Sequence, residues 1–444
     1  MFAPSRIRGP YGSHMTAELA LKAGRALGDW HEAVALGHDP RENARLLADA
    51  VATGIREAGG TVYRLGTVAS PAVSTAVRQQ DLDSGIAVTA APDPSEDVGL
   101  KLFDSDGSRL SWERQRHLVR RVNGTTADLA SCDSIGTEQW LEDAAEDYIE
   151  RLCDGQPSFD ETHAVVDAGE HRVDTVAETL ERLGCTVDRV TESSSDVFPR
   201  RRVAQGDSVC SALCDAVATS AADFGVAHDP DADRIVAIDE RGTVISGDTL
   251  LALLAKQTVE QSDKCGRVAV PLEASRRIEE VVDDAGGEIV RTQMDGMPGS
   301  GPASSTDVVF GGEPSGVHQW PAESPCPDAA LSAIHLARLV DDRVRLSKQA
   351  QRINDSSLYF DSFSVEKPTR AMSRITDDAQ DQFEDVQTDD GLFVEVDEAW
   401  FVVRPSRTTG ELRVTVEGTS NRNAKRLFDR VTRLVCTGEP TAVV

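Results

Sequence analysis

The sequence has little lysine, few aromatic residues and no long apolar run. Only seven of its 46 Lys and Arg residues are Lys, and Phe, Trp and Tyr together make up 5% of the chain. No stretch approaches the roughly 20 consecutive apolar residues that cross a bilayer, so no membrane partner is expected. Acidic residues outnumber basic ones by 75 to 46, and the net charge of −29 is spread along the chain. This charge disfavours nucleic acid as a partner.

The eight Cys residues form no Cys-x-x-Cys pair and no zinc-like spacing with His, so we expect buried, reduced thiols. An acid-rich, Lys-poor composition is typical of proteins kept soluble in concentrated salt. We therefore interpret the chain as halophilic, with an acidic mesophilic protein of GC-rich coding bias as the alternative. No apolar h-region follows residues 1–6, so no secretory signal is expected and a cytoplasmic location is predicted.

A length of 444 residues suggests about three domains of ~150 residues, with two or four equally admissible. Helix-like and strand-like segments alternate through three successive stretches, which predicts α/β layers with largely parallel sheets. The C-terminal stretch differs, because residues 391–396, 399–403 and 411–417 have the pattern of meandering strands before a closing helix over 420–435. We predict a separate α+β domain there.

The sharpest motif is Asp229-Pro230-Asp231-Ala232-Asp233-Arg234, between two strand-like segments. Three carboxylates at alternate positions can direct hard oxygen ligands at one Mg²⁺ or Ca²⁺. An EF-hand competes locally, since Glu240 falls at the twelfth position, but Arg234 stands where that loop needs Gly. A solvated acidic turn is the other alternative. Arg234 favours a phosphoryl ligand, because Mg²⁺ and a guanidinium together suit such groups.

Three further motifs are weaker when each is taken alone. An apolar strand ends at Phe310 in a glycine-rich loop that holds Glu313 and Ser315, which could reach sugar hydroxyls. Residues 404–408 with Arg413 form a cationic, hydroxyl-rich turn that could hold a phosphate. A Pro-rich turn over 89–95 is followed by Lys101. Ordinary turns and solvated Arg residues remain the alternatives for all three.

The order and spacing of these four motifs resemble the α-D-phosphohexomutase superfamily, which comprises phosphoglucomutases, phosphomannomutases and phosphoglucosamine mutases. The family opening Phe-Gly-Thr-Ser-Gly-Ile-Arg-Gly is met by Phe2 to Gly9, and its Asp-Gly-Asp-Gly-Asp-Arg loop by Asp229 to Arg234. Its Gly-Glu-x-Ser-Gly loop is met by Gly312 to Gly316, and its Arg-x-Ser-Gly-Thr loop by Arg404 to Thr408. The resemblance covers nearly the whole chain and is closest to the archaeal phosphoglucosamine mutase branch.

The resemblance implies an α/β fold with three consecutive similar α/β/α domains, whose sheets are mixed and mostly parallel, plus a C-terminal α+β domain, around a central cleft. It implies domain boundaries at 1–152, 153–247, 248–353 and 354–444. It also implies the following site: Lys101 and Arg8 as catalytic residues; Asp229, Asp231 and Asp233 as ligands of Mg²⁺; Arg234, Glu313 and Ser315 for the substrate; and Arg404, Ser406 and Thr408 for its phosphate.

One departure concerns the reaction itself. The family's catalytic loop reads Thr-Ala-Ser-His-Asn-Pro, and its serine carries the phosphoryl group, but this sequence has Ala91 at that place, followed by Pro92 and Asp93. A methyl group cannot carry a phosphoryl group, and losing a covalent nucleophile costs on the order of 10⁶ in rate in a protease example. The opening loop and phosphate loop depart too, with Arg6 and Arg407 in place of glycines.

Three functional hypotheses follow. The first is a phosphohexomutase that interconverts the 1- and 6-phosphates of glucosamine, mannose or glucose with a substitute donor such as Ser95 or Asp93. The second is a catalytically silent pseudoenzyme that binds Mg²⁺ and a hexose phosphate and acts as a sensor, a regulatory partner or a subunit of a homodimer or mixed dimer with an active mutase. The third is a remodelled phosphatase, in which water replaces the sugar hydroxyl.

Overall fold

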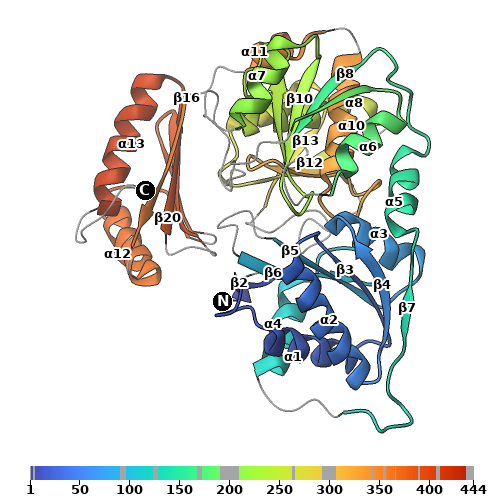
Figure 1. The fold of residues 1–444 in the computed structure, drawn as a ribbon. Helices are drawn as coiled ribbons and strands as arrows, with labels where there is room; N and C mark the ends of the chain where they lie inside the picture. The colour runs from blue at the N-terminus through green and yellow to red at the C-terminus, as the bar shows by residue number, and fades with distance from the viewer. Residues whose placement is uncertain are drawn as a thin grey trace.

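The fold is given by a computed structural model of the chain. It describes residues 2–3, 6–90, 97–123, 129–167, 173–190, 210–262, 266–292, 307–341, 344–353, 357–365, 367–388, 391–406 and 411–436. Two predicted site residues, Ala91 and Thr408, lie outside these ranges, as do the two suggested substitute donors, Ser95 and Asp93. Four separate sheets organise the described chain, and Figure 1 shows them in sequence order from blue to red.

The first sheet has the strand order β1-β2-β6-β5-β3-β4-β7, parallel from β5 to β7 and antiparallel on the side of β6, β2 and β1. Successive side chains of a strand point to opposite faces. Val34 and Leu36 of β3 accordingly pack with α1, α2 and α4, whereas Ala35 packs on the other face with α3 and α5. The elements are β1 (Phe2–Ala3), β2 (Arg6–Pro10), α1 (Ala17–Gly28), β3 (Ala33–His38), α2 (Glu42–Glu57), β4 (Thr61–Thr67), α3 (Ser70–Gln79), β5 (Ser84–Ala90), β6 (Asp97–Asp104), α4 (Trp112–Asn123), β7 (Glu138–Trp140) and α5 (Ala144–Cys153).

The second and third sheets are smaller and repeat one plan, in which parallel strands are followed by one antiparallel edge strand. Their orders are β11-β10-β8-β9 and β13-β12-β14-β15, with β11 and β15 antiparallel to their neighbours. In both cases a short hairpin turn joins the last two strands. The second unit contains β8 (His163–Asp167), α6 (Thr175–Arg182), β9 (Thr186–Val190), α7 (Ser211–Thr219), β10 (Phe224–His228) and β11 (Ile235–Asp239). The third contains α8 (Gly247–Gln261), β12 (Arg267–Pro271), α9 (Arg276–Asp284), β13 (Glu288–Thr292), β14 (Val308–Glu313), β15 (Val317–Gln319), α10 (Ala329–Asp341) and α11 (Leu346–Ile353).

The fourth sheet is antiparallel throughout, with the order β16-β20-β19-β18-β17. One face is apolar and packs on α12 and α13, which lie on the side away from the rest of the molecule (Figure 1). The other face is turned toward the third unit. The fourth unit contains β16 (Ser357–Ser364), α12 (Pro368–Gln380), β17 (Val386–Gln387), β18 (Leu392–Val396), β19 (Ala399–Pro405), β20 (Glu411–Gly418) and α13 (Asn421–Cys436).

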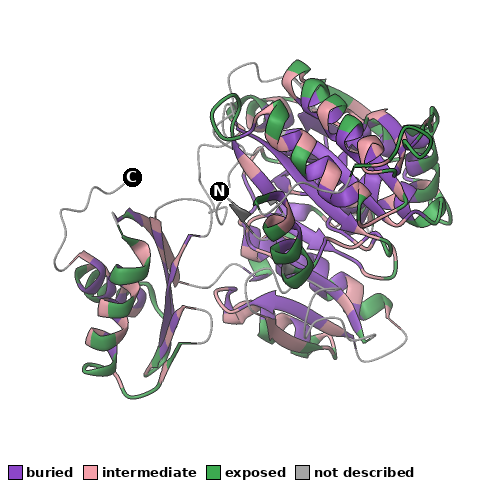
Figure 2. Ribbon diagram, turned by 90° about the horizontal axis from the view of Figure 1, so that it is seen from below, coloured by how far each residue is buried: buried purple, intermediate pink, exposed green. Residues whose placement is uncertain are grey.

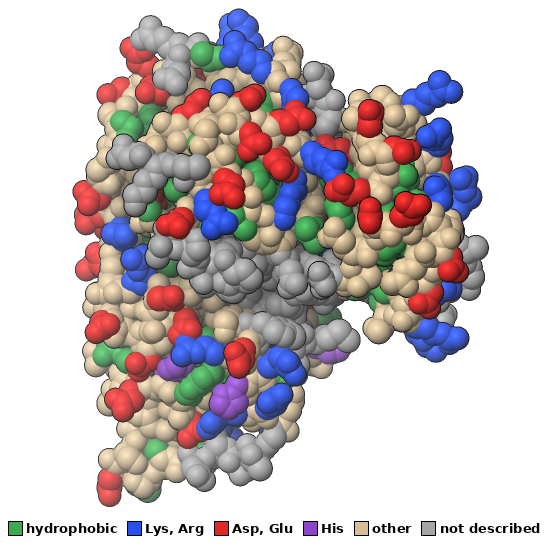
Figure 3. Space-filling model, turned by 180° about the vertical axis from the view of Figure 1, so that it is seen from behind, with side chains coloured by type: hydrophobic (Ala, Val, Ile, Leu, Met, Phe, Trp, Pro, Cys, Tyr) green, Lys and Arg blue, Asp and Glu red, His purple; other side chains and the backbone are tan. Residues whose placement is uncertain are grey.

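The core joins the first three units and leaves the fourth with its own. One apolar cluster runs from α3 and α5 through α6 and α8 to α10, whereas the apolar residues of the fourth unit cluster separately. Figure 2 shows the buried residues along the strands and on the inner sides of the helices. On the face in Figure 3, acidic side chains are scattered among single basic ones. Among the described residues, no helix has the length and apolarity that a membrane crossing requires.

The predicted fold is therefore confirmed: three α/β/α units with mixed, mostly parallel sheets are followed by a C-terminal unit with an antiparallel sheet. The apolar strand that was predicted to end at Phe310 continues as β14 to Glu313. This extension carries Glu313 to the antiparallel partner β15, where it pairs with Val317.

Helices α1 and α2 pack closely through glycines, which gives a test of the first unit. A Cβ atom at Gly54 would lie 2.2 Å from the Leu21 carbonyl oxygen of the facing helix. We predict that Gly54→Ala lowers the free energy of unfolding by about 1–3 kcal/mol, because the two helices must move apart to admit the methyl group. This loss is expected although alanine has a higher helix propensity than glycine. Denaturant unfolding measures this. The neighbouring exposed Thr53→Ala, as control, changes stability by less than about 0.5 kcal/mol, and equal or greater stability of Gly54→Ala would contradict the close packing.

Candidate metal and sugar-phosphate site

The acidic motif forms the turn of the β10–β11 hairpin. The side chains of Asp229, Asp231 and Asp233 are buried, and one ligand oxygen from each lies within 4.8 Å of the others. Asp229 Oδ1 accepts the backbone N–H groups of Asp233 at 3.0 Å and Arg234 at 3.3 Å, which holds the turn closed. Burial of all three carboxylates is incompatible with the solvated acidic turn considered from the sequence.

The EF-hand alternative is also wrong. The flanking elements are paired antiparallel strands, not helices. Glu240 follows the second strand and accepts hydrogen bonds from Ser347, through the hydroxyl at 2.5 Å and the backbone N–H at 3.0 Å. The acidic triad therefore consists of Asp229, Asp231 and Asp233 without the twelfth-position carboxylate.

The triad suits a hard divalent cation. Burial and the nearby carboxylates of Asp233 and Asp231 raise the pKa of Asp229 well above its usual value. Asp229 Oδ2 accepts no hydrogen bond from any described residue, and the Arg234 Nε is 3.9 Å away. Three carboxylates that repel one another in a buried turn favour a cation, and carboxylate oxygens are the ligands that Mg²⁺ prefers. The residues that would hold Mg²⁺ are thus Asp229, Asp231 and Asp233.

Two cations from the first unit meet the triad. Lys101, on β6 and only 2% exposed, places its Nζ 2.5 Å from Asp233 Oδ2 and 3.6 Å from Asp231 Oδ2. Arg109 Nη2 lies 2.6 Å from the same Asp233 oxygen. Sequence reasoning found Lys101 but missed Arg109. The sequence feature that could have located Arg109 is the Asp-x-Asp-Gly turn at the end of β6, which reverses the chain so that Arg109 pairs with Phe103.

Thr89 was also missed as an individual site residue. It is buried at the end of β5, and its hydroxyl donates a hydrogen bond to Asp231 Oδ1. The hydroxyl therefore touches the triad two residues before Ala91, which belongs to a stretch that the structure does not describe. Arg8, on β2 beside β6, donates from Nε to Asp97 Oδ2 at 3.3 Å. Arg8 thus lies against β6, the strand that carries Lys101.

The predicted sugar loop is joined to the triad hairpin by backbone contacts. Ile235 N–H donates to the Gly316 carbonyl at 3.0 Å, and Arg234 forms a bridge with Val317. Gly316 has φ +87°, and a Cβ there would lie 2.2 Å from the Ile235 carbonyl oxygen, so this approach requires glycine. Ser315 Oγ donates to Glu313 Oε2 at 2.9 Å. Glu313, Ser315 and Arg234 are thus brought to one place.

The predicted phosphate-binding turn begins at the end of β19 in the fourth unit. Arg404 and Ser406 are buried, and Arg404 Nη2 donates to Glu273 Oε1 of the third unit. Arg413 lies directly opposite Arg404 in the sheet. Burial and the positive charge of Arg234 lower the pKa of Arg413, while Glu411 and Glu313 oppose that shift. Charges from the second, third and fourth units therefore act on one another here.

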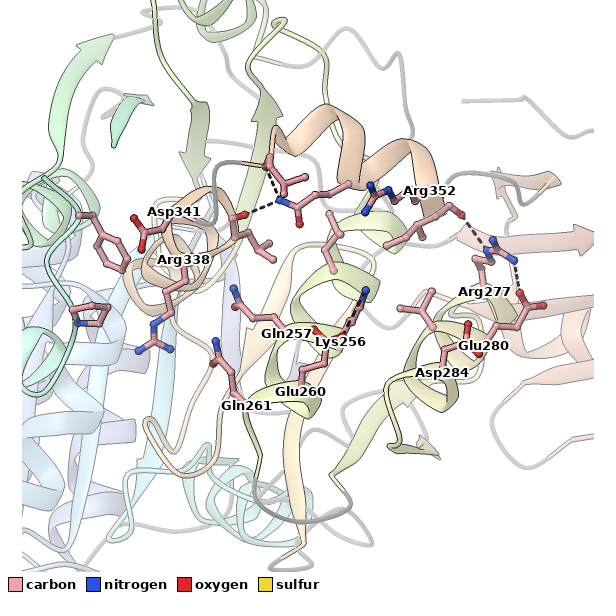
Figure 4. A pocket seen from close by; sticks show the side chains of 18 residues that line it. Lys256, Gln257, Glu260, Gln261, Arg277, Glu280, Asp284, Arg338, Asp341 and Arg352 are labelled. Atoms are coloured by element: carbon pink, nitrogen blue, oxygen red, sulfur yellow. Dashed lines mark hydrogen bonds and ion pairs between the residues drawn. The ribbon is translucent and has the colours of Figure 1, made fainter. Parts of the chain in front are cut away.

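A separate hollow of about 830 Å³ lies among α8, α9, α10 and α11, on the third unit (Figure 4). Its lining mixes basic side chains such as Lys256 and Arg352 with acidic ones such as Glu260 and Asp284. None of the predicted site residues lines it. This hollow is therefore distinct from the site around the triad.

Four family models match the chain in order. They are the phosphoglucomutase/phosphomannomutase alpha/beta/alpha domains I, II and III, on residues 1–128, 158–242 and 246–356, and the C-terminal domain, on residues 363–434. The fold and the arrangement of the motifs agree with these matches. The chain therefore belongs to the phosphoglucomutase/phosphomannomutase family, a family of phosphohexomutases.

Within that family, the chain is similar to archaeal phosphoglucosamine mutases. A probable phosphoglucosamine mutase of Methanopyrus kandleri is 33% identical over 441 residues, which cover 98% of this chain and 97% of the relative. A solved family member from Burkholderia thailandensis has a TM-score of 0.82 at 20% identity and covers 99% of this chain and 98% of its own. A serine-to-alanine variant of the Aspergillus fumigatus N-acetylphosphoglucosamine mutase, solved with glucose 1,6-bisphosphate, has a TM-score of 0.54 at 14% identity and covers 95% and 93%.

Metal binding by the triad can be tested through stability. We predict that saturating Mg²⁺ raises the unfolding temperature of the natural chain, since a ligand at about 100 times its Kd adds roughly 2.7 kcal/mol. Asp229→Asn removes one ligand charge and abolishes the Mg²⁺-dependent rise, although it also relieves repulsion in the metal-free triad. Exposed Asp188→Asn on β9 is the control and keeps the full rise. An equal rise in Asp229→Asn would place the metal elsewhere.

Proposed function

We propose that this chain binds a hexose phosphate at the triad, with a glucosamine phosphate as the first candidate, without passing a phosphoryl group through an enzyme-bound serine. The observation that carries the proposal is a contrast within one site. Lys101 of the first unit meets the triad of the second, the triad hairpin contacts the third, and Arg234 acts electrostatically on Arg413 of the fourth, whereas the position that carries the phosphoryl group in the family is Ala91. Binding groups are thus retained at a centre that lacks the family's covalent nucleophile.

The proposed roles follow from position. Asp229, Asp231 and Asp233 would hold Mg²⁺, which when bound neutralises charge on phosphoryl oxygens. Glu313 and Ser315, at the end of β14, would accept and donate hydrogen bonds to sugar hydroxyls, and Arg234 would contact the phosphate nearest the triad. Arg404 and Ser406, with Thr408 from outside the described residues, would hold the far phosphate. In the Ala91→Ser variant, Lys101 would orient the reacting hydroxyl and exchange its proton.

Two comparisons support the ligand class. Two archaeal relatives that cover 98% of this chain are named probable phosphoglucosamine mutases, which favours a glucosamine phosphate over the mannose and glucose phosphates. The serine-to-alanine variant from Aspergillus fumigatus contains glucose 1,6-bisphosphate, so a protein of this fold that lacks one serine hydroxyl can still bind a sugar phosphate. We infer for this chain a cytoplasmic role as a sensor, or as a subunit of a homodimer or of a mixed dimer with an active mutase.

The test is a coupled assay for phosphate migration with Mg²⁺, using glucosamine, glucose and mannose phosphates with and without the matching 1,6-bisphosphate. The natural chain is expected to bind glucosamine 6-phosphate in calorimetry yet turn over on the order of 10⁶ more slowly than an active mutase. Ala91→Ser is expected to raise the rate above background, because it supplies the missing oxygen. Efficient turnover by the natural chain would contradict the proposal that it is catalytically silent. Absence of binding would contradict the proposal that it binds a hexose phosphate.

A second candidate function is a working mutase with a substitute phosphoryl acceptor, and the Thr89 hydroxyl favours it. This hydroxyl already touches Asp231, so its proton has a carboxylate acceptor and its oxygen adjoins the metal ligands. If Thr89 carries the phosphoryl group, Thr89→Val abolishes turnover and Thr89→Ser retains it. If turnover is absent from the natural chain and from both variants while all three bind ligand, Thr89 serves only to orient Asp231.

A further inference from the structure

The sheet of the fourth unit presents a polar face to the third unit. Directly opposed residues of antiparallel strands share a face, and side chains alternate along each strand. Ala399, Phe401 and Val403 of β19 belong to the apolar cluster under α12 and α13. Trp400 and Arg404 therefore point the other way, together with their partners Glu417 and Arg413 on β20. This second face carries two arginines at its end nearest the predicted phosphate turn.

The N-terminus of α9 docks on this face. Glu417 accepts hydrogen bonds from the Ser275 hydroxyl, from Arg276 N–H at 2.9 Å and from Trp400 Nε1 at 2.8 Å. Arg276 also donates to Glu395 of β18. Glu417 thus caps a helix of the neighbouring unit, where a negative charge is favourable. This clasp holds the fourth unit on the third without using Arg404.

The two arginines need an anion. Like charges directly opposite in a sheet repel, and Arg413 Nε is buried and donates no hydrogen bond to any described residue. The chain meets this need with its own carboxylate, because Glu273, in the turn between β12 and α9, accepts a hydrogen bond from Arg404. Both side chains are shielded, with 6% of Arg404 and 16% of Glu273 exposed.

We propose that Glu273 occupies the place of the ligand's phosphate on Arg404, and so sets the affinity of the site for sugar phosphates as an internal competitor. A guanidinium binds carboxylate and phosphate through the same planar N–H donors, so the two anions compete for one surface. A phosphate that reaches Arg404 must displace Glu273, while the Glu417 clasp stays in place. The inference rests on the proposed binding of a hexose phosphate.

The experiment is calorimetric titration of the full chain with glucosamine 6-phosphate in the presence of Mg²⁺. Glu273→Gln keeps the size of the side chain but removes its charge, and we expect its Kd to fall about tenfold, since a charge-assisted bond no longer has to be exchanged. Glu395→Gln is the matched control. It removes another carboxylate between the same two units, away from Arg404, and its Kd stays within about twofold of the natural value.

The outcomes separate the inference from the proposed function. An unchanged or higher Kd in Glu273→Gln, with the natural chain binding normally, overturns the competitor role and leaves the binding function intact. Equal tightening in Glu395→Gln also overturns it, because general loosening between the units would then explain the effect. Binding by Glu273→Gln alone supports it, and no binding by any variant overturns both proposals. If Glu273→Gln does not fold, the shorter Glu273→Asp must tighten binding in the same direction.

Discussion

The buried carboxylate triad in the β10–β11 hairpin is the constraint on which the rest of the site depends. Three carboxylates placed within 4.8 Å of one another out of solvent are costly unless positive charge reaches them. The first unit supplies Lys101 and Arg109 to Asp233, and Arg234 lies within 4 Å of two members from the hairpin itself. The ion pairs that compensate this negative charge thus join the first unit to the second. The hydrogen bond between Ile235 and Gly316 joins the third unit to the same hairpin. Asp229 Oδ2, which accepts no hydrogen bond from any described residue, leaves a carboxylate oxygen that a divalent cation would bind.

The same arrangement separates binding from covalent chemistry. The side chains that can hold metal, sugar and phosphate come from strand ends and hairpins of rigid sheets, whose positions do not depend on one loop residue. In the proposed function the covalent step is lost through the single position Ala91, while Lys101 of the neighbouring strand β6 keeps its ion pair with Asp233. The hydrogen bonds of Glu417 to α9 hold the fourth unit against the third, and Arg404 pairs with Glu273 of the third unit.

Sequence reasoning reached the fold because helical and strand periodicity repeats clearly in three units and changes in the fourth. It also reached the triad, since alternate carboxylates before Arg234 form a local pattern. Arg109, Thr89 and Glu273 were missed as individual site residues because each contacts the site only through the tertiary fold, which local sequence patterns do not specify. Burial of Asp229 likewise depends on tertiary packing, and the pairing of Arg404 with Arg413 depends on the register of β19 and β20. The roles assigned to Ala91 and Thr408 stay predictions, since both lie outside the described residues.

The central claim is that the site recognises a sugar phosphate but forms no phosphoenzyme. Phosphorus NMR of the natural chain mixed with Mg²⁺ and glucosamine 1,6-bisphosphate tests it most directly, because bound ligand, released monophosphate and a protein-linked phosphate give separate signals. The account predicts two shifted ligand resonances that persist with no protein-linked phosphate. A protein-linked phosphate that appears as monophosphate is released would contradict it.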